Sequence, residues 1–129
     1  MRIGRGPAPK LTRENIKMLN TALWLFGIGA IGGLVLASRV LRDKLAPWAL
    51  SLLHALLGAI GLILLIVLLV EGSATQQVLV GFIILLIAAL GGFFLASFHL
   101  RKRIPPKAVV LTHAIVAVVG FLTVLSVVL

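Results

Sequence analysis

Four long apolar runs, separated by short polar links, dominate the pattern of this chain. The runs cover residues 20–38, 48–70, 78–98 and 108–129, and the links cover residues 39–47, 71–77 and 99–107. A helix needs about 20 apolar residues to cross the roughly 30 Å of hydrocarbon in a bilayer. We therefore expect four transmembrane helices, and the short links leave no room for a catalytic domain outside the membrane.

The N-terminal segment, residues 1–19, carries more charge than the runs that follow it. Residues 1–10 are basic and contain glycine and proline, which is typical of a tail without fixed structure. Residues 11–19 mix charged and apolar side chains, so they could form a short interfacial helix or simply flank the first span. The first apolar run is too long for a signal peptide and lacks a cleavage motif before a polar sequence, so we interpret it as a helix.

An internal repeat relates the two halves of the chain at an offset of 59 residues, and residues 32–61 lie over residues 91–120 without a gap. Matches between leucines or alanines are expected in so apolar a chain, but five other matches are not. These are Gly33 with Gly92, Ser38 with Ser97, Arg42 with Arg101, Pro47 with Pro106, and His54 with His113. Each copy predicts a helix, a basic turn and a second helix. The repeat thus predicts an all-α membrane bundle of two tandem hairpins, residues 20–70 and 71–129, in parallel orientation.

Composition excludes several classes of function. Of the 129 residues, 61% are hydrophobic and 12% are charged, whereas roughly a quarter of a soluble domain is charged. The chain has no cysteine, which removes disulfides, thiolate metal sites, iron–sulfur clusters and covalently attached haem. Glu14, Asp43 and Glu71 all lie outside the apolar runs, which argues against hydrolysis by carboxylates and against a buried acidic proton relay. We expect no independent catalytic activity.

The net charge of +9 lies in the tail and the turns, so it does not indicate a nucleic-acid partner. Seven of the twelve basic residues fall in the links at 39–47 and 99–107, and five lie near the N-terminus. The positive-inside rule therefore favours turns that face the cytoplasm, and we expect a protein of the prokaryotic inner membrane. Arg42 and Arg101 could also bind anionic lipid or the carboxylates of a cofactor.

Small residues recur four apart in the first and third predicted helices. They are Gly29, Gly33 and Ala37 in one copy and Ala88, Gly92 and Ala96 in the other. Such a stripe lets membrane helices approach closely, so packing alone could explain it. A ligand that lies against Gly33 and Gly92 is the alternative.

The clearest candidate for chemistry is the pair His54 and His113. Each histidine follows the proline that opens its helix by seven residues, which places both about 10 Å below the same membrane surface. An ionisable side chain within the hydrocarbon is costly and therefore indicates a function, although a structural hydrogen bond to a neighbouring carbonyl could also retain it. His99, which has Val40 as its counterpart, is interpreted as an exposed residue of the turn.

The expected topology makes the second and fourth helices diagonal neighbours, with axes about 11–14 Å apart. Two histidines that reach inward across this distance leave room for a planar cofactor, and haem b is compatible with the absence of cysteine. Small residues on the same helix faces would make space for the ring: Gly58, Gly61, Ala117 and Gly120. Gly33 and Gly92 would lie at the ring edges, and Arg42 and Arg101 would meet the propionates.

Our preferred hypothesis from the sequence is a small membrane subunit that holds one haem b, with His54 and His113 as metal ligands, for electron transfer within a membrane complex. The alternative is an accessory subunit without a cofactor, which packs through its glycine and alanine stripes against other subunits or a second copy. In that case the histidines serve as internal hydrogen bonds. A transporter is disfavoured because the spans lack charged groups, broken helices and inverted repeats.

Overall fold

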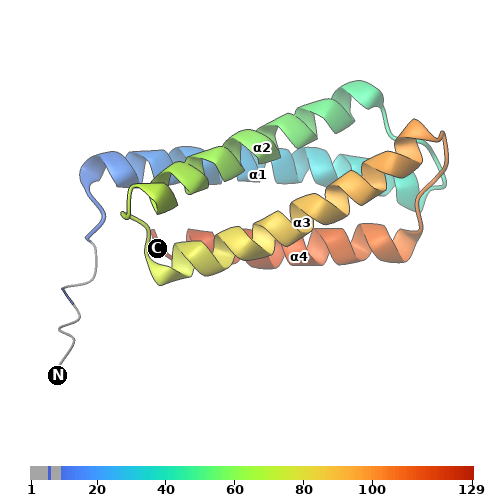
Figure 1. Ribbon diagram of the computed structural model, residues 1–129. Coiled ribbons are helices and arrows are strands. Elements are labelled where there is room, and N and C mark those ends of the chain that lie inside the picture. The colour runs from blue at the N-terminus through green and yellow to red at the C-terminus, as the bar shows by residue number, and fades with distance from the viewer. Residues whose placement is uncertain (1–5, 7–9) are drawn as a thin grey trace.

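The computed structural model describes Gly6 and residues 10–129, and its regular secondary structure there is entirely helical. The helices are α1 (Arg13–Leu41), α2 (Trp48–Val70), α3 (Gln76–Leu100) and α4 (Lys107–Leu125) (Figure 1). All four are long and apolar enough to cross a membrane, as the sequence predicted. The expected mobile tail, residues 1–10, lies almost wholly outside the described residues.

The helices begin at residues that suit their N-termini. The side chain of Thr12 accepts a hydrogen bond from the backbone N–H of Asn15 at 3.2 Å, and Thr75 caps α3 in the same way through Val78 at 3.3 Å. Because α1 already begins at Arg13, residues 13–19 form its first turns and not a separate interfacial helix. α2 and α4 each begin directly after a proline, which has no backbone N–H that would need a partner.

The turns that follow α1 and α3 have the same backbone conformation. Asp43 and Lys102, 59 residues apart, adopt left-handed φ values of 56° and 54°. In each turn the next residue donates its N–H to a carbonyl five residues earlier, at 3.0 Å for Lys44 and 2.9 Å for Arg103. This pairing satisfies a carbonyl that the end of the helix leaves free and stops the helix at the same position in both turns.

The four helices form a bundle in which neighbours in the sequence are neighbours in space (Figure 1). α1 packs extensively against α2, and α3 packs extensively against α4. Smaller interfaces join α1 to α4 and α2 to α3. Within the described residues, α2 and α4 do not approach each other, and neither do α1 and α3. α2 and α4 are therefore the diagonal pair that the histidine hypothesis requires.

The densest packing lies at one end of the bundle. We call the end that holds residues 71–75 and the C-terminus the link end, and the end that holds residues 42–47 and 101–106 the turn end. The large side chains with no exposed surface gather toward the link end: Leu19, Leu65, Leu68, Val78 and Val124. The first hairpin, α1 with α2, is thus packed against the second hairpin, α3 with α4, mainly at the link end. The histidines lie in the half of the bundle nearer the turns.

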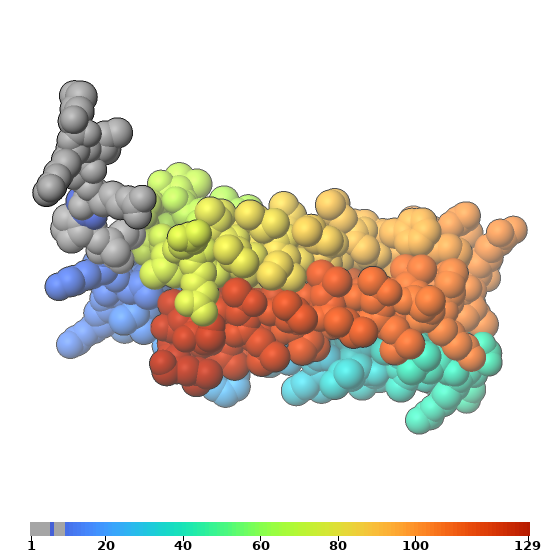
Figure 2. Space-filling view, turned by 90° about the horizontal axis from the view of Figure 1, so that it is seen from below, coloured from blue at the N-terminus to red at the C-terminus, as the bar shows by residue number. Residues whose placement is uncertain are grey.

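The outer surface of the bundle is strongly apolar. Large hydrophobic side chains face outward along every helix, with Trp24 on α1 73% exposed and Phe93 on α3 71% exposed. Figure 2 shows one side of the resulting rod, on which closely packed helices run from one end to the other. Water solvates such an apolar surface poorly, whereas the hydrocarbon of a bilayer solvates it well. The fold is therefore consistent with an integral membrane protein.

Candidate functional site

His54 on α2 and His113 on α4 meet across the bundle. The centres of their imidazole rings lie 6.3 Å apart, and the ring planes make an angle of 79°. Their helices do not approach each other, so the two side chains bridge the diagonal. The structure thus brings together the two residues that the repeat places at one depth.

Each histidine is held by a hydrogen bond to the neighbouring helix of its own hairpin. His54 Nδ1 lies 2.8 Å from the carbonyl oxygen of Gly29, and His113 Nδ1 lies 2.8 Å from that of Ala88. A carbonyl oxygen can only accept, so Nδ1 donates and Nε2 of a neutral ring carries the free lone pair. Among the described residues, neither Nε2 atom has a hydrogen-bond partner. Both rings therefore keep one nitrogen available as a ligand.

Gly33 and Gly92 allow the imidazoles to lie close against α1 and α3. A Cβ atom on Gly33 would be 2.9 Å from His54 Cε1, and one on Gly92 would be 3.3 Å from His113 Cε1. The first distance is shorter than real side chains tolerate. Gly33 thus contacts His54, and Gly92 contacts His113. At these positions the small residues allow the two helices of each hairpin to pack closely.

Two other glycines do not leave the space that the sequence indicated. A Cβ atom on Gly61 would approach the ring of Phe26 to 2.7 Å, and one on Gly120 would approach Leu85 to 2.8 Å. Both glycines therefore receive a large side chain from the adjacent helix, and the prediction of free space is wrong at these positions. At Gly58, by contrast, no atom of the described chain lies within 4 Å of an added Cβ.

Arg42 and Arg101 lie at the turn end, where they form the C-caps of α1 and α3. The guanidinium of Arg101 lies 4.7 Å from the ring centre of Phe98, and its Nε donates to the carbonyl of Ser97 at 3.2 Å. Its side chain is therefore turned back along α3. Both arginines are exposed, and they lie at the end of the bundle nearer the histidines, not beside the imidazoles.

His99 is a contact residue that the sequence analysis assigned wrongly to the exposed turn. It belongs to α3 and is half-buried, and its ring stacks on Trp48 of α2 with centres 3.9 Å apart and planes at 23°. Its Nδ1 also lies 3.4 Å from Ser51 Oγ. The repeat held a signal for this contact, because His99 and Trp48 both differ from their counterparts, Val40 and Lys107.

A second contact joins the two hairpins at the turn end. Lys107 at the start of α4 pairs with Asp43 beyond the end of α1, with 3.1 Å between nitrogen and oxygen. Both side chains are partly or largely exposed, so the ion pair contributes about 0–1 kcal/mol to stability. We refer to the Trp48–His99 stack and the Asp43–Lys107 ion pair as the two clasps.

The number of protein ligands limits the metal chemistry of this site. Within the described residues, no cluster of three or more histidine, cysteine, aspartate or glutamate side chains could hold a metal ion. Structural zinc sites take four protein ligands and catalytic ones three. Haem iron, in contrast, obtains four ligands from the macrocycle and needs only axial ligands from the protein. Two imidazoles on diagonal helices are therefore too few for a zinc site of either kind.

The chain matches no protein-family model, no curated protein and no solved structure. Its structural class therefore rests on the structure alone. It is a four-helix bundle whose helices can span a membrane, with two imidazoles that meet between its diagonal helices.

Proposed function

We propose that this chain is a small integral membrane subunit that holds one haem b between α2 and α4 and carries electrons within a membrane complex. The Nε2 atoms of His54 and His113 are the two axial ligands. The observation that carries this proposal is the separation of the two imidazole rings, 6.3 Å between centres, with both Nδ1 atoms bound to backbone carbonyls.

The ring separation suits ligation of one iron from both sides. A metal–imidazole bond of about 2 Å on each side, with about 1 Å from each nitrogen to its ring centre, places the two centres about 6 Å apart. The separation of 6.3 Å in the structure is close to this value when both Nε2 atoms face the iron. The angle of 79° between the ring planes is no obstacle, because each ring can take any rotation about its own metal–nitrogen bond.

The hydrogen bonds of the two Nδ1 atoms support the same proposal. Histidine ligands usually donate the N–H of their second nitrogen to a carbonyl or carboxylate, which fixes the tautomer and makes the ligating nitrogen more basic. The carbonyls of Gly29 and Ala88 serve this purpose here. If the histidines only joined helices within each hairpin, the hydrogen bonds would be explained but the approach of the two rings would not.

The haem would lie in the half of the bundle nearer the turns, where fewer side chains are fully buried than at the link end. Gly33 and Gly92 keep Cβ atoms away from the imidazoles on the α1 and α3 sides. The propionates would point to the turn end, where Arg42 and Arg101 could form charge-assisted hydrogen bonds with them.

We further propose that the hairpins are tandem copies in parallel orientation and that the turn end faces the cytoplasm. Three structural features recur at the offset of 59 residues and support the copies: the histidine–carbonyl bond, the ring–glycine contact, and the left-handed residue of the turn. The excess of basic residues in the turns supports the orientation.

The experiment is the visible spectrum of the full chain, expressed with a supply of haem precursor and purified in mild detergent. We expect a reduced-minus-oxidised b-type signal and one haem per chain in the pyridine haemochrome assay. A protein that stays colourless under these conditions would overturn the haem proposal. The accessory-subunit alternative, in which the histidines are internal hydrogen bonds, would then take its place.

A further inference from the structure

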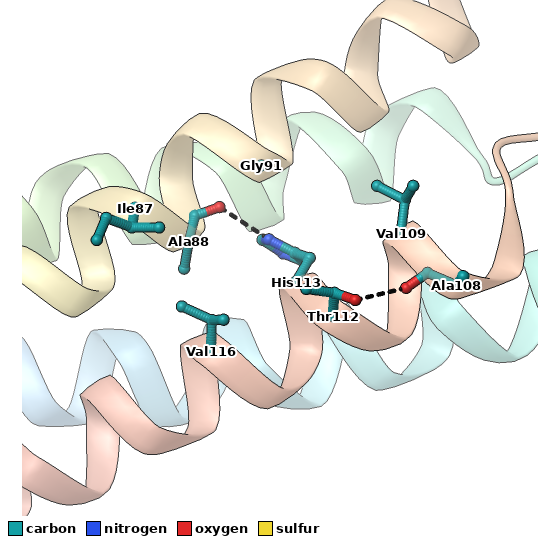
Figure 3. A pocket seen from close by; sticks show the side chains of 8 residues that line it. All are labelled: Ile87, Ala88, Gly91, Ala108, Val109, Thr112, His113 and Val116. Atoms are coloured by element: carbon teal, nitrogen blue, oxygen red, sulfur yellow. Dashed lines mark hydrogen bonds between the residues drawn. The ribbon is translucent and has the colours of Figure 1, made fainter.

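A groove of about 300 Å³ runs between α3 and α4, on the side of these helices that faces away from the first hairpin (Figure 3). Its lining comes from Ala88 and Gly91 on α3 and from Val109, Thr112, His113 and Val116 on α4. Two polar atoms in this lining already have partners, because Thr112 Oγ1 donates to the carbonyl of Ala108 at 2.8 Å and His113 Nδ1 donates to Ala88. The groove therefore offers an occupant mainly apolar contact.

The first hairpin provides an internal comparison, because it carries larger side chains at the equivalent positions. Where the groove has Val109, Thr112 and Val116, the positions 59 residues earlier hold Leu50, Leu53 and Leu57. The Cδ1 atom of Leu50 comes within 3.6 Å of a Cβ built on Gly32. At Gly91, the counterpart of Gly32, only atoms of His113 lie within 4 Å. The second hairpin thus carries smaller side chains at three adjoining positions.

The rim of the groove differs between the hairpins in charge as well. The groove begins at Ala108, next to Lys107, and the adjoining turn carries Arg101, Lys102 and Arg103 without an acidic residue. The first hairpin has Trp48 in place of Lys107 and Asp43 in place of Lys102. The smaller side chains and the greater positive charge therefore occur together on the second hairpin.

We propose that the groove binds one acyl chain of an anionic phospholipid, whose phosphate lies against Lys102 and Arg103 of the adjoining turn, since Lys107 is already paired with Asp43. From Ala108 to Val116 the helix rises about 12 Å, which is a suitable length for such a chain. The basic rim lies where the headgroups of the same leaflet lie, and it attracts anionic ones.

This proposal is independent of haem, so it can be tested on the full chain whether or not a cofactor is bound. Native mass spectrometry of the detergent-purified protein, with phosphatidylglycerol or phosphatidylcholine of equal chain length, measures the bound lipid. We expect one phosphatidylglycerol per chain and at least tenfold weaker binding of phosphatidylcholine. Equal binding of the two lipids would overturn the proposal.

Substitutions in the groove test whether the lipid binds there. The triple variant V109L/T112L/V116L gives the groove the leucines of the first hairpin, and we expect at least a tenfold loss of phosphatidylglycerol binding. The control is V118L/V119L, which adds the same kind of bulk to α4 at two exposed residues outside the groove and should bind as the wild type does. Undiminished binding by the triple variant would overturn the proposal.

A conservative variant keeps the test informative if the triple variant does not fold. The chain has no cysteine, so Thr112→Cys provides a single thiol in the groove. Phosphatidylglycerol should slow its reaction with a membrane-permeable maleimide several-fold, and phosphatidylcholine should not. Lys102→Gln together with Arg103→Gln should remove this difference, whereas Lys44→Gln in the other turn should preserve it. A labelling rate that does not respond to phosphatidylglycerol would contradict the proposal.

Discussion

The imidazoles of His54 and His113 approach to 6.3 Å between ring centres although the helices that carry them do not approach each other. Each ring is tied to a different hairpin through its Nδ1 atom, at 2.8 Å from Gly29 in one case and from Ala88 in the other. The distance between the rings is therefore set by the way in which the two hairpins sit against each other.

The first prediction concerns the axial ligands. His54→Leu and His113→Leu should each abolish the low-spin, six-coordinate haem spectrum, because one imidazole cannot supply both axial bonds. His99→Leu also removes an imidazole but lies at the turn end, so its spectrum should remain six-coordinate. Optical and electron paramagnetic resonance spectra of the three purified variants measure this. A low-spin spectrum that survives either of the first two changes would show that the ligands are other residues.

The second prediction compares the two glycines that touch the histidines. Gly33→Ala should destabilise the protein by about 1–3 kcal/mol, the usual range for overpacking, because the new Cβ would be 2.9 Å from His54 Cε1. Gly92→Ala should cost less, since its Cβ would be 3.3 Å from His113 Cε1. Gly58→Ala meets no atom within 4 Å and serves as the control. Thermal unfolding in detergent measures all three, and equal midpoints would contradict the packing described for these rings.

The third prediction concerns the clasp between α2 and α3. His99→Val, which installs the residue found at the equivalent position of the first hairpin, removes the stack on Trp48. Such an aromatic contact contributes about 0.5–1.5 kcal/mol beyond the area that it buries. In a Trp24→Phe background, where Trp48 is the remaining tryptophan, we expect altered intensity and wavelength of its fluorescence. His99→Phe keeps an aromatic ring and should restore the wild-type emission wavelength. No change in His99→Val would mean that the stack does not form in the membrane.

The fourth prediction is the orientation of the chain. Lys44→Cys and Glu71→Cys introduce single thiols into exposed positions at opposite ends of the bundle. A membrane-impermeant maleimide should label position 71 in intact cells, and position 44 only after the membrane is opened. The reverse pattern would show that the basic N-terminal tail, and not the basic turns, decides the topology.

The four helices and the depth of the histidines could be predicted from the sequence, because both follow from counting residues. The length of an apolar run determines whether it spans the membrane, and the distance from a helix-opening proline determines depth. The contacts of Gly33 and Gly92 followed from the same counting, since both lie as far from the turn as the imidazoles do.

Contacts that depend on a particular neighbouring side chain could not be predicted in this way. Gly61 and Gly120 lie on the expected faces, but nothing in the spacing showed that Phe26 and Leu85 fill the space beside them. His99 was expected in the exposed turn, but it stacks on Trp48, which lies on a helix whose rotation the sequence pattern leaves open. The sequence contained one further signal: residues that differ between the two copies can be the residues through which the copies contact each other.

The two clasps have a consequence for how the halves can be combined. Two copies of the first hairpin would place Trp48 against Val40 and also against Asp43, so neither clasp could form. Two copies of the second hairpin would bring Lys107 close to His99 and to Lys102, where like charges repel. Neither half can therefore replace the other by self-association.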